Sequence, residues 1–188
     1  MKWSGFRAAM AGPTEGADAI AGEERRKTLD LLLANPTSRA RVVVDKFLAL
    51  CAQLIVLGVV LWSLLVALTA IFDVDLGAWV LAAATAHALA FAIAFGAAAL
   101  ALGAAVGSKP AASGVVTSFA AASYVWESVT AIVPDLEGFA WLSPFHHYVA
   151  SDPLVRGFGL SYLLAFVAAA VVLVALGVLA FSKRDVRN

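Results

Sequence analysis

Two ionisable side chains lie inside long apolar stretches of this sequence. Glu127 is the only acid within such a stretch, and His87 is the only base. An ionisable group is costly in hydrocarbon, so it usually faces a bundle interior or water. The pair therefore indicates a proton relay or contacts with a polar substrate. Two plainer interpretations, which we favour, stay open: a neutral His87 hydrogen-bonded across helices, and a Glu127 carboxylate near lipid headgroups.

Other kinds of chemistry have little support. His146 and His147 with Asp152 suggest a metal, but adjacent histidines project differently and no third ligand has a fixed spacing, so we expect no metal site. Gly107-Ser108-Lys109-Pro110 does not fit the phosphate-binding pattern Gly-x-x-x-x-Gly-Lys-Ser/Thr. Cys51 is the only cysteine, which excludes an internal disulfide. We therefore predict no catalytic residue, no cofactor held by this chain and no enzyme activity.

Four apolar stretches must position these residues. They run over about 47–72, 77–106, 111–133 and 160–181. Each reaches the ~20 residues that a helix needs to cross the hydrocarbon core. The chain is 62% hydrophobic with a mean hydropathy of +0.90, which is too apolar for a water-soluble domain. The predicted fold class is therefore an all-α membrane protein, with four transmembrane helices in a transmembrane domain over 47–188.

Positive charge is segregated along the chain. Of the 13 Lys and Arg residues, 12 fall on one side of the four stretches, and Arg156 alone falls on the other. Cytoplasmic loops carry the excess of Lys and Arg, so both termini are predicted to be cytoplasmic. The formal net charge of zero gives no sign of a nucleic-acid partner.

A cytoplasmic amphipathic helix is predicted over 23–34, after a segment 1–22 with little pattern. Leu29, Leu32 and Leu33 form an apolar stripe at helical spacing, and Asn35-Pro36 ends the helix. Residues 35–46 then lead into the first span. An exposed leucine stripe needs a partner surface, or it rests on membrane lipids.

Residues 134–159 are too long for a turn and too apolar for a solvated loop. Pro144 and Pro153 divide this segment, and Trp and Tyr in it suit a membrane interface. We predict one or two short helices that lie at, or dip into, the outer membrane face.

Three parts of the sequence form a recognisable set. The first has an acidic pair, a Thr-Leu, an apolar triplet, a Pro and a Ser-Arg: Glu23-Glu24, Thr28-Leu29, Leu31-Leu32-Leu33, Pro36 and Ser38-Arg39. The second is Leu142-Ser-Pro-Phe-His-His-Tyr, followed by Asp152-Pro-Leu and Gly157, and the third is the tail Phe181-Ser-Lys-Arg-Asp-Val. Together they resemble the ABC-2 type transporter permeases. In that family the first segment is the cytoplasmic loop, the second is the extracellular region before the last helix and the third is the C-terminal ending.

This resemblance implies a coupling helix over 23–34 that sits in a groove of a cytoplasmic ATP-binding cassette subunit. That subunit, and not this chain, would bind ATP and Mg. The residues implied at this ATPase-coupling interface are Glu23, Glu24, Arg25, Thr28, Leu29, Leu32 and Leu33. A second permease copy or a homologous subunit would complete the pore, in a prokaryotic plasma membrane. Family members usually have two further helices before the coupling loop. We therefore expect a C-terminal four-helix portion of a longer permease, a chain whose missing helices a neighbouring chain supplies, or a reduced four-helix form.

The predicted function is that of a membrane subunit of an ATP-driven exporter. We expect its substrate path between the second and third spans and beneath segment 134–159. Candidate residues on this path are His87, Phe119, Tyr124, Trp126 and Glu127. Two other classes of function stay open. One is a non-transporting membrane anchor that recruits a cytoplasmic partner, and the other is a small proton-coupled carrier that uses His87 and Glu127.

Overall fold

A computed structural model describes residues 39–183, and all of its regular elements are helices. In chain order they are α5 (Arg39–Ile71), α6 (Ala78–Val106), α7 (Lys109–Thr130), the 3-10 helix η2 (Pro134–Leu142), α8 (Pro144–Ala150), α9 (Pro153–Arg156) and α10 (Leu160–Lys183). The all-α prediction is confirmed for this part of the chain. The predicted coupling helix over 23–34 and the segment 1–22 lie outside the described residues.

Three of these helices are long and apolar enough to cross a membrane: Ala40–Ile71, Ala78–Val106 and Leu160–Lys183. The predicted third span, 111–133, forms α7, which has 22 residues but is not among the three. Its six Ser and Thr residues, together with Glu127, make it more polar than the others. Length and composition therefore give three candidate spans among residues 39–183, where the sequence predicted four.

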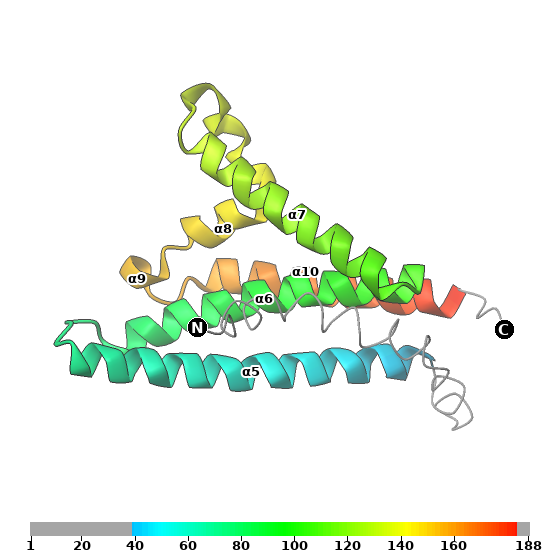
Figure 1. Cartoon of the computed structure of the whole chain (residues 1–188), viewed down its shortest axis with the longest axis horizontal. Helices are drawn as coiled ribbons and strands as arrows, with labels where there is room; N and C mark the ends of the chain where they lie inside the picture. The colour runs from blue at the N-terminus through cyan, green and yellow to red at the C-terminus, as the bar shows by residue number, and fades with distance from the viewer. Residues whose placement is uncertain (1–38, 184–188) are drawn as a thin grey trace, which may run out of the picture.

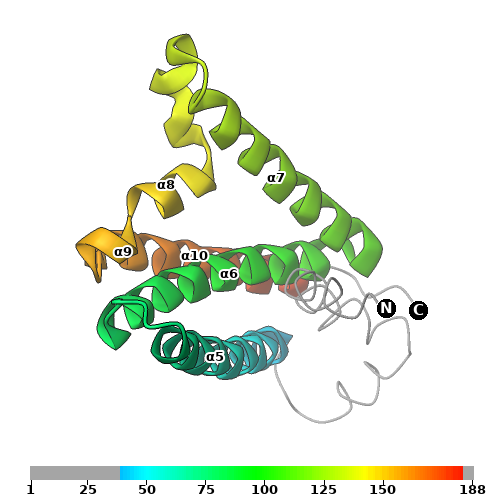
Figure 2. The same cartoon turned by 60° about the vertical axis from the view of Figure 1, so that its left-hand side comes forward.

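Helices α5, α6 and α10 lie side by side, and each touches the other two (Figure 1). Helix α7 meets α6 near Lys109 and leans away from the other three in both views (Figure 2). The link between α6 and α7 is short: Gly107 ends α6 in the left-handed conformation with φ 68°, and Ser108 precedes α7.

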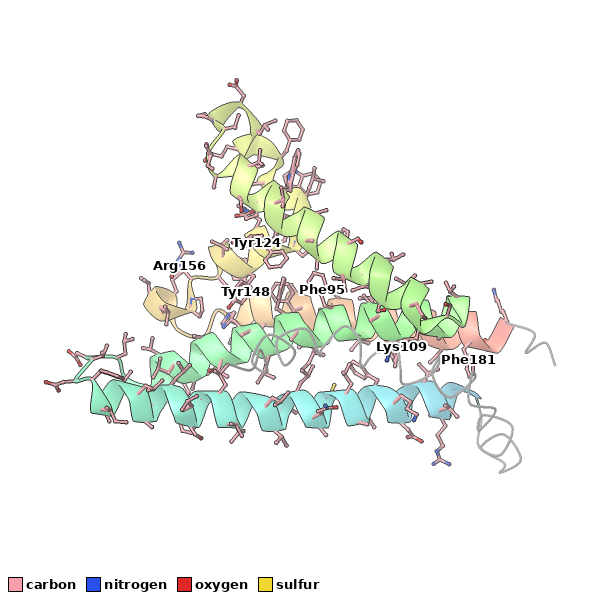
Figure 3. All side chains as sticks on the ribbon, viewed as in Figure 1. Phe95, Lys109, Tyr124, Tyr148, Arg156 and Phe181 are labelled. Atoms are coloured by element: carbon pink, nitrogen blue, oxygen red, sulfur yellow. The ribbon has the colours of Figure 1, made fainter. Side chains whose placement is uncertain are left out.

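One end of the bundle carries the basic residues. The first turns of α5 and α7 and the last turn of α10 meet there, and we call it the basic end because it includes Arg41, Lys109 and Lys183. Arg156 lies toward the opposite end (Figure 3). For the Lys and Arg residues within 39–183, the segregation of charge read from the sequence is therefore present in three dimensions.

The best-buried part of the bundle joins α5, α6 and α10 near the basic end. Its buried members are Val43, Ala97, Leu100, Ala104, Ala170, Val174 and Phe181. Small residues on α6 and α10 let the backbones approach closely, as is typical where packing drives helix association. A Cβ built on Gly177 of α10 would lie 3.0 Å from the Cα of Ala101 on α6. At the other end of the bundle, the Trp62 indole N–H donates a hydrogen bond to the Ala78 carbonyl at 3.0 Å.

Segment 134–159 forms three short helices, η2, α8 and α9, where one or two were predicted. Pro134, Pro144 and Pro153 each stand at the start of one of them. Proline fits the first helical position because its missing N–H has no partner there in any case. The prolines therefore begin helices as well as divide the segment. Helix α9 packs on α6, and η2 and α8 pack on α7. The segment therefore connects the far end of α7 to the bundle of α5, α6 and α10.

Candidate functional site: an apolar cavity beside segment 134–159

An apolar cavity of about 560 Å³ lies between α6, α7 and α10, with η2 and α8 along one side. Its lining includes Phe95 and Ala98 of α6, Phe119 of α7, Trp141 of η2 and Ala169 of α10. Pockets of this size bind small molecules, mostly through apolar and aromatic contacts. The cavity can therefore hold an apolar group.

The cavity has one titratable lining residue, His147. The His147 Nε2–H donates a hydrogen bond to the Trp141 carbonyl at 3.1 Å, which fixes the ring against η2. No group of three or more His, Cys, Asp or Glu residues that could hold a metal ion occurs within residues 39–183. The other lining residues are apolar or aromatic, so the lining suits contact with an apolar group.

Phe91 connects α6 to the surrounding aromatic side chains. Its ring lies 4.8 Å from Phe145 of α8, 4.9 Å from Phe95 and 5.3 Å from Phe166 of α10, measured between centroids. Tyr148 of α8 lies 5.1 Å away. Tilted and edge-on ring pairs at such distances are favourable beyond the apolar area they bury. Phe91 therefore fastens α8 to both α6 and α10 at the edge of the cavity.

The other side of segment 134–159 is attached to α7 by polar contacts. The Ser143 hydroxyl donates to the Ser123 carbonyl at 2.8 Å and accepts from the Phe145 N–H at 3.1 Å, which also caps α8. The Trp126 indole N–H donates to the Phe139 carbonyl at 3.1 Å. The segment thus bridges α7 and the bundle, with aromatic contacts on one side and hydrogen bonds on the other.

Glu127 and His146 form a further link between α7 and α8. The distance from Glu127 Oε1 to His146 Nδ1 is 3.4 Å, and the two side chains are 17% and 38% exposed. The second carboxylate oxygen of Glu127 is buried and has no hydrogen-bond partner among residues 39–183. The sequence singled out each of these residues but not their pairing, because they are 19 positions apart in the chain.

The five predicted path residues do not gather in one place. Phe119 lines the cavity. Tyr124 packs edge-on against Phe145 at 5.5 Å, and Trp126 and Glu127 contact segment 134–159 as described above. The fifth residue, His87 of α6, is not part of the cavity lining.

That fifth residue is His87, which is fully buried. Its Nδ1–H donates a hydrogen bond to the Ala83 carbonyl of its own helix at 2.8 Å. The interpretation of a hydrogen bond across helices is therefore wrong for this nitrogen, because the acceptor lies one turn earlier on α6. The seven residues of the predicted ATPase-coupling interface lie outside the described residues.

Ser143 gives a direct test of the attachment to α7. Replacing it by alanine removes a donor and a helix cap from a side chain that is 1% exposed. We expect a loss of about 1–3 kcal/mol in the free energy of unfolding. Thermal unfolding in detergent measures this, with Ser128→Ala as the control, because the Ser128 hydroxyl bonds only within α7 at an exposed position. Equal melting temperatures for the two variants would contradict the attachment.

A family comparison identifies the chain. A family model described as ABC-2 family transporter protein matches residues 5–186. The chain belongs to this family. The resemblance seen in the sequence is therefore confirmed, and this ABC-2 protein is a permease-type membrane component and not the ATPase of a transporter. Comparison with curated proteins and with solved structures gave no match.

Proposed function

We propose that this ABC-2 protein is a membrane subunit, or the C-terminal part of one, of an ATP-driven exporter. ATP hydrolysis in a partner subunit would drive passage of a substrate through the space between α6, α7 and α10. Family membership over residues 5–186 supports the transport role. The observation that carries the location is the apolar cavity of about 560 Å³ at the junction of these helices.

In this proposal α7 crosses the membrane as a fourth span. A helix of 22 residues is ~33 Å long, which is enough for the hydrocarbon core. Two of its polar side chains would be kept from lipid, because Ser123 is buried and Glu127 contacts His146 of segment 134–159. The basic end would then face the cytoplasm, with both termini, and segment 134–159 would lie at the outer face.

The ATP-binding cassette subunit would dock on the coupling helix over 23–34, with ATP and Mg bound in that subunit. Leu29, Leu32 and Leu33 would enter its groove, and Glu23, Glu24, Arg25 and Thr28 would make polar contacts. A second permease copy or a homologous subunit would complete the pore. The apolar surface of α5, where Ile55, Val56 and Val60 are exposed, would face lipid or that second subunit.

The substrate route would begin at the cavity and leave past segment 134–159. Phe119 would contact the substrate in the cavity, and Tyr124, Trp126 and Glu127 would contact it along the exit. An almost wholly apolar lining favours a substrate with a substantial apolar part. His87 would act on this route only through the packing of α6 against the α9–α10 junction.

Partner capture tests the proposal. We expect Leu32→Asp to abolish co-purification with a co-expressed ATP-binding cassette protein that the parent chain captures, because a charge would enter an apolar groove. Leu31→Asp is the matched control: it introduces the same charge beside the predicted stripe. We expect Leu31→Asp to retain the partner and its ATP hydrolysis in nanodiscs.

Three outcomes would contradict the proposal. Equal capture by both variants and the parent protein would remove the coupling helix from the docking surface. Capture of the partner without any ATP hydrolysis by the complex would favour the membrane-anchor function. Proton movement by the purified chain alone, lost in His87→Ala, would favour the proton-coupled carrier.

A further inference from the structure

His87 has a buried nitrogen that no residue of α6 uses. The side chain is 0% exposed, and its Nδ1 is bonded to the Ala83 carbonyl at 2.8 Å. A carbonyl oxygen only accepts hydrogen bonds, so Nδ1 carries the hydrogen of the neutral ring. Nε2 is then an acceptor, and it has no hydrogen-bond partner among residues 39–183. A buried acceptor without a donor is costly, so its surroundings decide what it binds.

Nε2 faces the junction between α9 and α10. A Cβ built on Gly159 would lie 3.5 Å from His87 Nε2, 3.9 Å from the Ser151 carbonyl oxygen and 3.4 Å from Cδ2 of Tyr162. The space beside Gly159 is therefore bounded by two hydrogen-bond acceptors and the edge of a ring. Ser151 is itself 1% exposed. Two buried acceptors that face one small space need a species with two hydrogens to donate.

We propose that this space binds one water molecule, which donates hydrogen bonds to His87 Nε2 and to the Ser151 carbonyl. A single buried water usually has two to four polar partners, and this site supplies two. Glycine at 159 leaves room for this water, because the Cβ of any other residue would lie between Gly159 and the two acceptors. The site differs from the apolar cavity, whose lining includes neither His87 nor Gly159.

The water would join α6 to the far end of segment 134–159. Ser151 caps α8, and Gly159 directly precedes α10. Beside them, the Phe158 ring packs against Trp79 of α6 at 4.6 Å. A bridge at this point holds the junction on α6 and therefore fixes the position of the C-terminal end of α8 relative to the cavity.

Alanine at 159 distinguishes a space that holds water from an empty one. Its nearest contact would be 3.4 Å, which is an ordinary van der Waals distance, so the methyl group fits. If the space holds water, the methyl group displaces it and leaves both acceptors without a donor. We then expect Gly159→Ala to melt about 3–6 °C below the control described next.

The matched control is Gly77→Ala. Gly77 and Gly159 each accept two backbone N–H bonds at the start of a long helix, from Val80 and Leu81 and from Tyr162 and Leu163 respectively. Nothing lies within 4 Å of a Cβ built on Gly77, so its replacement reports only the change of residue at a helix start. Gly159→Ala melting at or above the Gly77→Ala temperature would overturn the proposal, because a methyl group that fills an empty space is favourable.

A second experiment tells whether Gly159→Ala is destabilising because hydrogen bonds are lost or because the added methyl group is crowded. In a His87→Leu background one acceptor is gone, so we expect Gly159→Ala to cost no more than Gly77→Ala does there. An undiminished cost in that background would show crowding by the methyl group and would overturn the proposal. If His87→Leu does not fold, the comparison of the two glycine variants in the parent protein decides alone. None of these measurements depends on transport.

Discussion

Replacing Gly177 by leucine is expected to separate α10 from α6. A Cβ at Gly177 would lie 3.0 Å from the Cα and 3.3 Å from the Cβ of Ala101, and backbone cannot turn aside as a flexible side chain does. A leucine side chain therefore forces the two helices apart and opens the core around Leu100 and Val174. We expect a loss of about 3 kcal/mol or more in the free energy of unfolding. Thermal unfolding in detergent and the yield of monodisperse protein measure it.

Gly114→Leu is the control for this experiment. Gly114 lies within α7, and nothing lies within 4 Å of a Cβ built there. Leucine should be tolerated, and removal of a glycine from a helix interior should slightly stabilise α7. Similar melting temperatures for Gly177→Leu and the parent protein would show that α6 and α10 are not packed through this contact.

Replacing Phe91 by alanine is expected to release α8 from the bundle. The change removes the contacts with Phe95, Phe145, Tyr148 and Phe166 together, and it enlarges the cavity that Phe91 helps to line. Large-to-small changes at aromatic positions cost about 3 kcal/mol or more. We expect a matching fall in stability, and faster proteolysis within segment 134–159 at temperatures where the helices remain folded.

Phe72→Ala serves as the comparison, because Phe72 is 70% exposed at the end of α5. It should change neither stability nor proteolysis. If Phe91→Ala behaved like Phe72→Ala, the ring cluster would not hold α8. In the complex with the ATP-binding subunit, Phe91→Ala should also change the rate of ATP hydrolysis if the cavity lies on the substrate route, and Phe72→Ala should not.

The helices themselves follow from local sequence. Apolar length predicted α6 and α10 close to their observed bounds of Ala78–Val106 and Leu160–Lys183. Helix α5 begins at Arg39, so residues 39–46 of the basic lead-in and the first span form one continuous helix. The segregation of Lys and Arg also predicted that the first turns of α5 and α7 and the last turn of α10 lie at the same end of the bundle. These properties depend on residues near one another in the chain, so periodicity and composition are enough to predict them.

The site depended on contacts that no local pattern encodes. Glu127 stood out as an acid in an apolar stretch, but its pairing with His146 depends on how α8 folds back on α7. Phe91 is one phenylalanine among eleven in the sequence and becomes central only when four other rings meet it. Gly177 is inconspicuous until Ala101 is placed against it. Such pairings follow from the relative placement of helices, which one sequence does not supply.

The two-residue link at Gly107 and Ser108 has a mechanical consequence. Helix α7 touches α6 close to this link and diverges from it beyond (Figure 2). Rotation about this link, taken as a pivot at the basic end, would move the 22 residues of α7 together as one helix ~33 Å long. A rotation of about 5° at the pivot carries the far tip about 3 Å. Movement too small to disturb the close-packed core beside the pivot would therefore be magnified into a displacement as large as a water molecule where α7 meets η2 and α8.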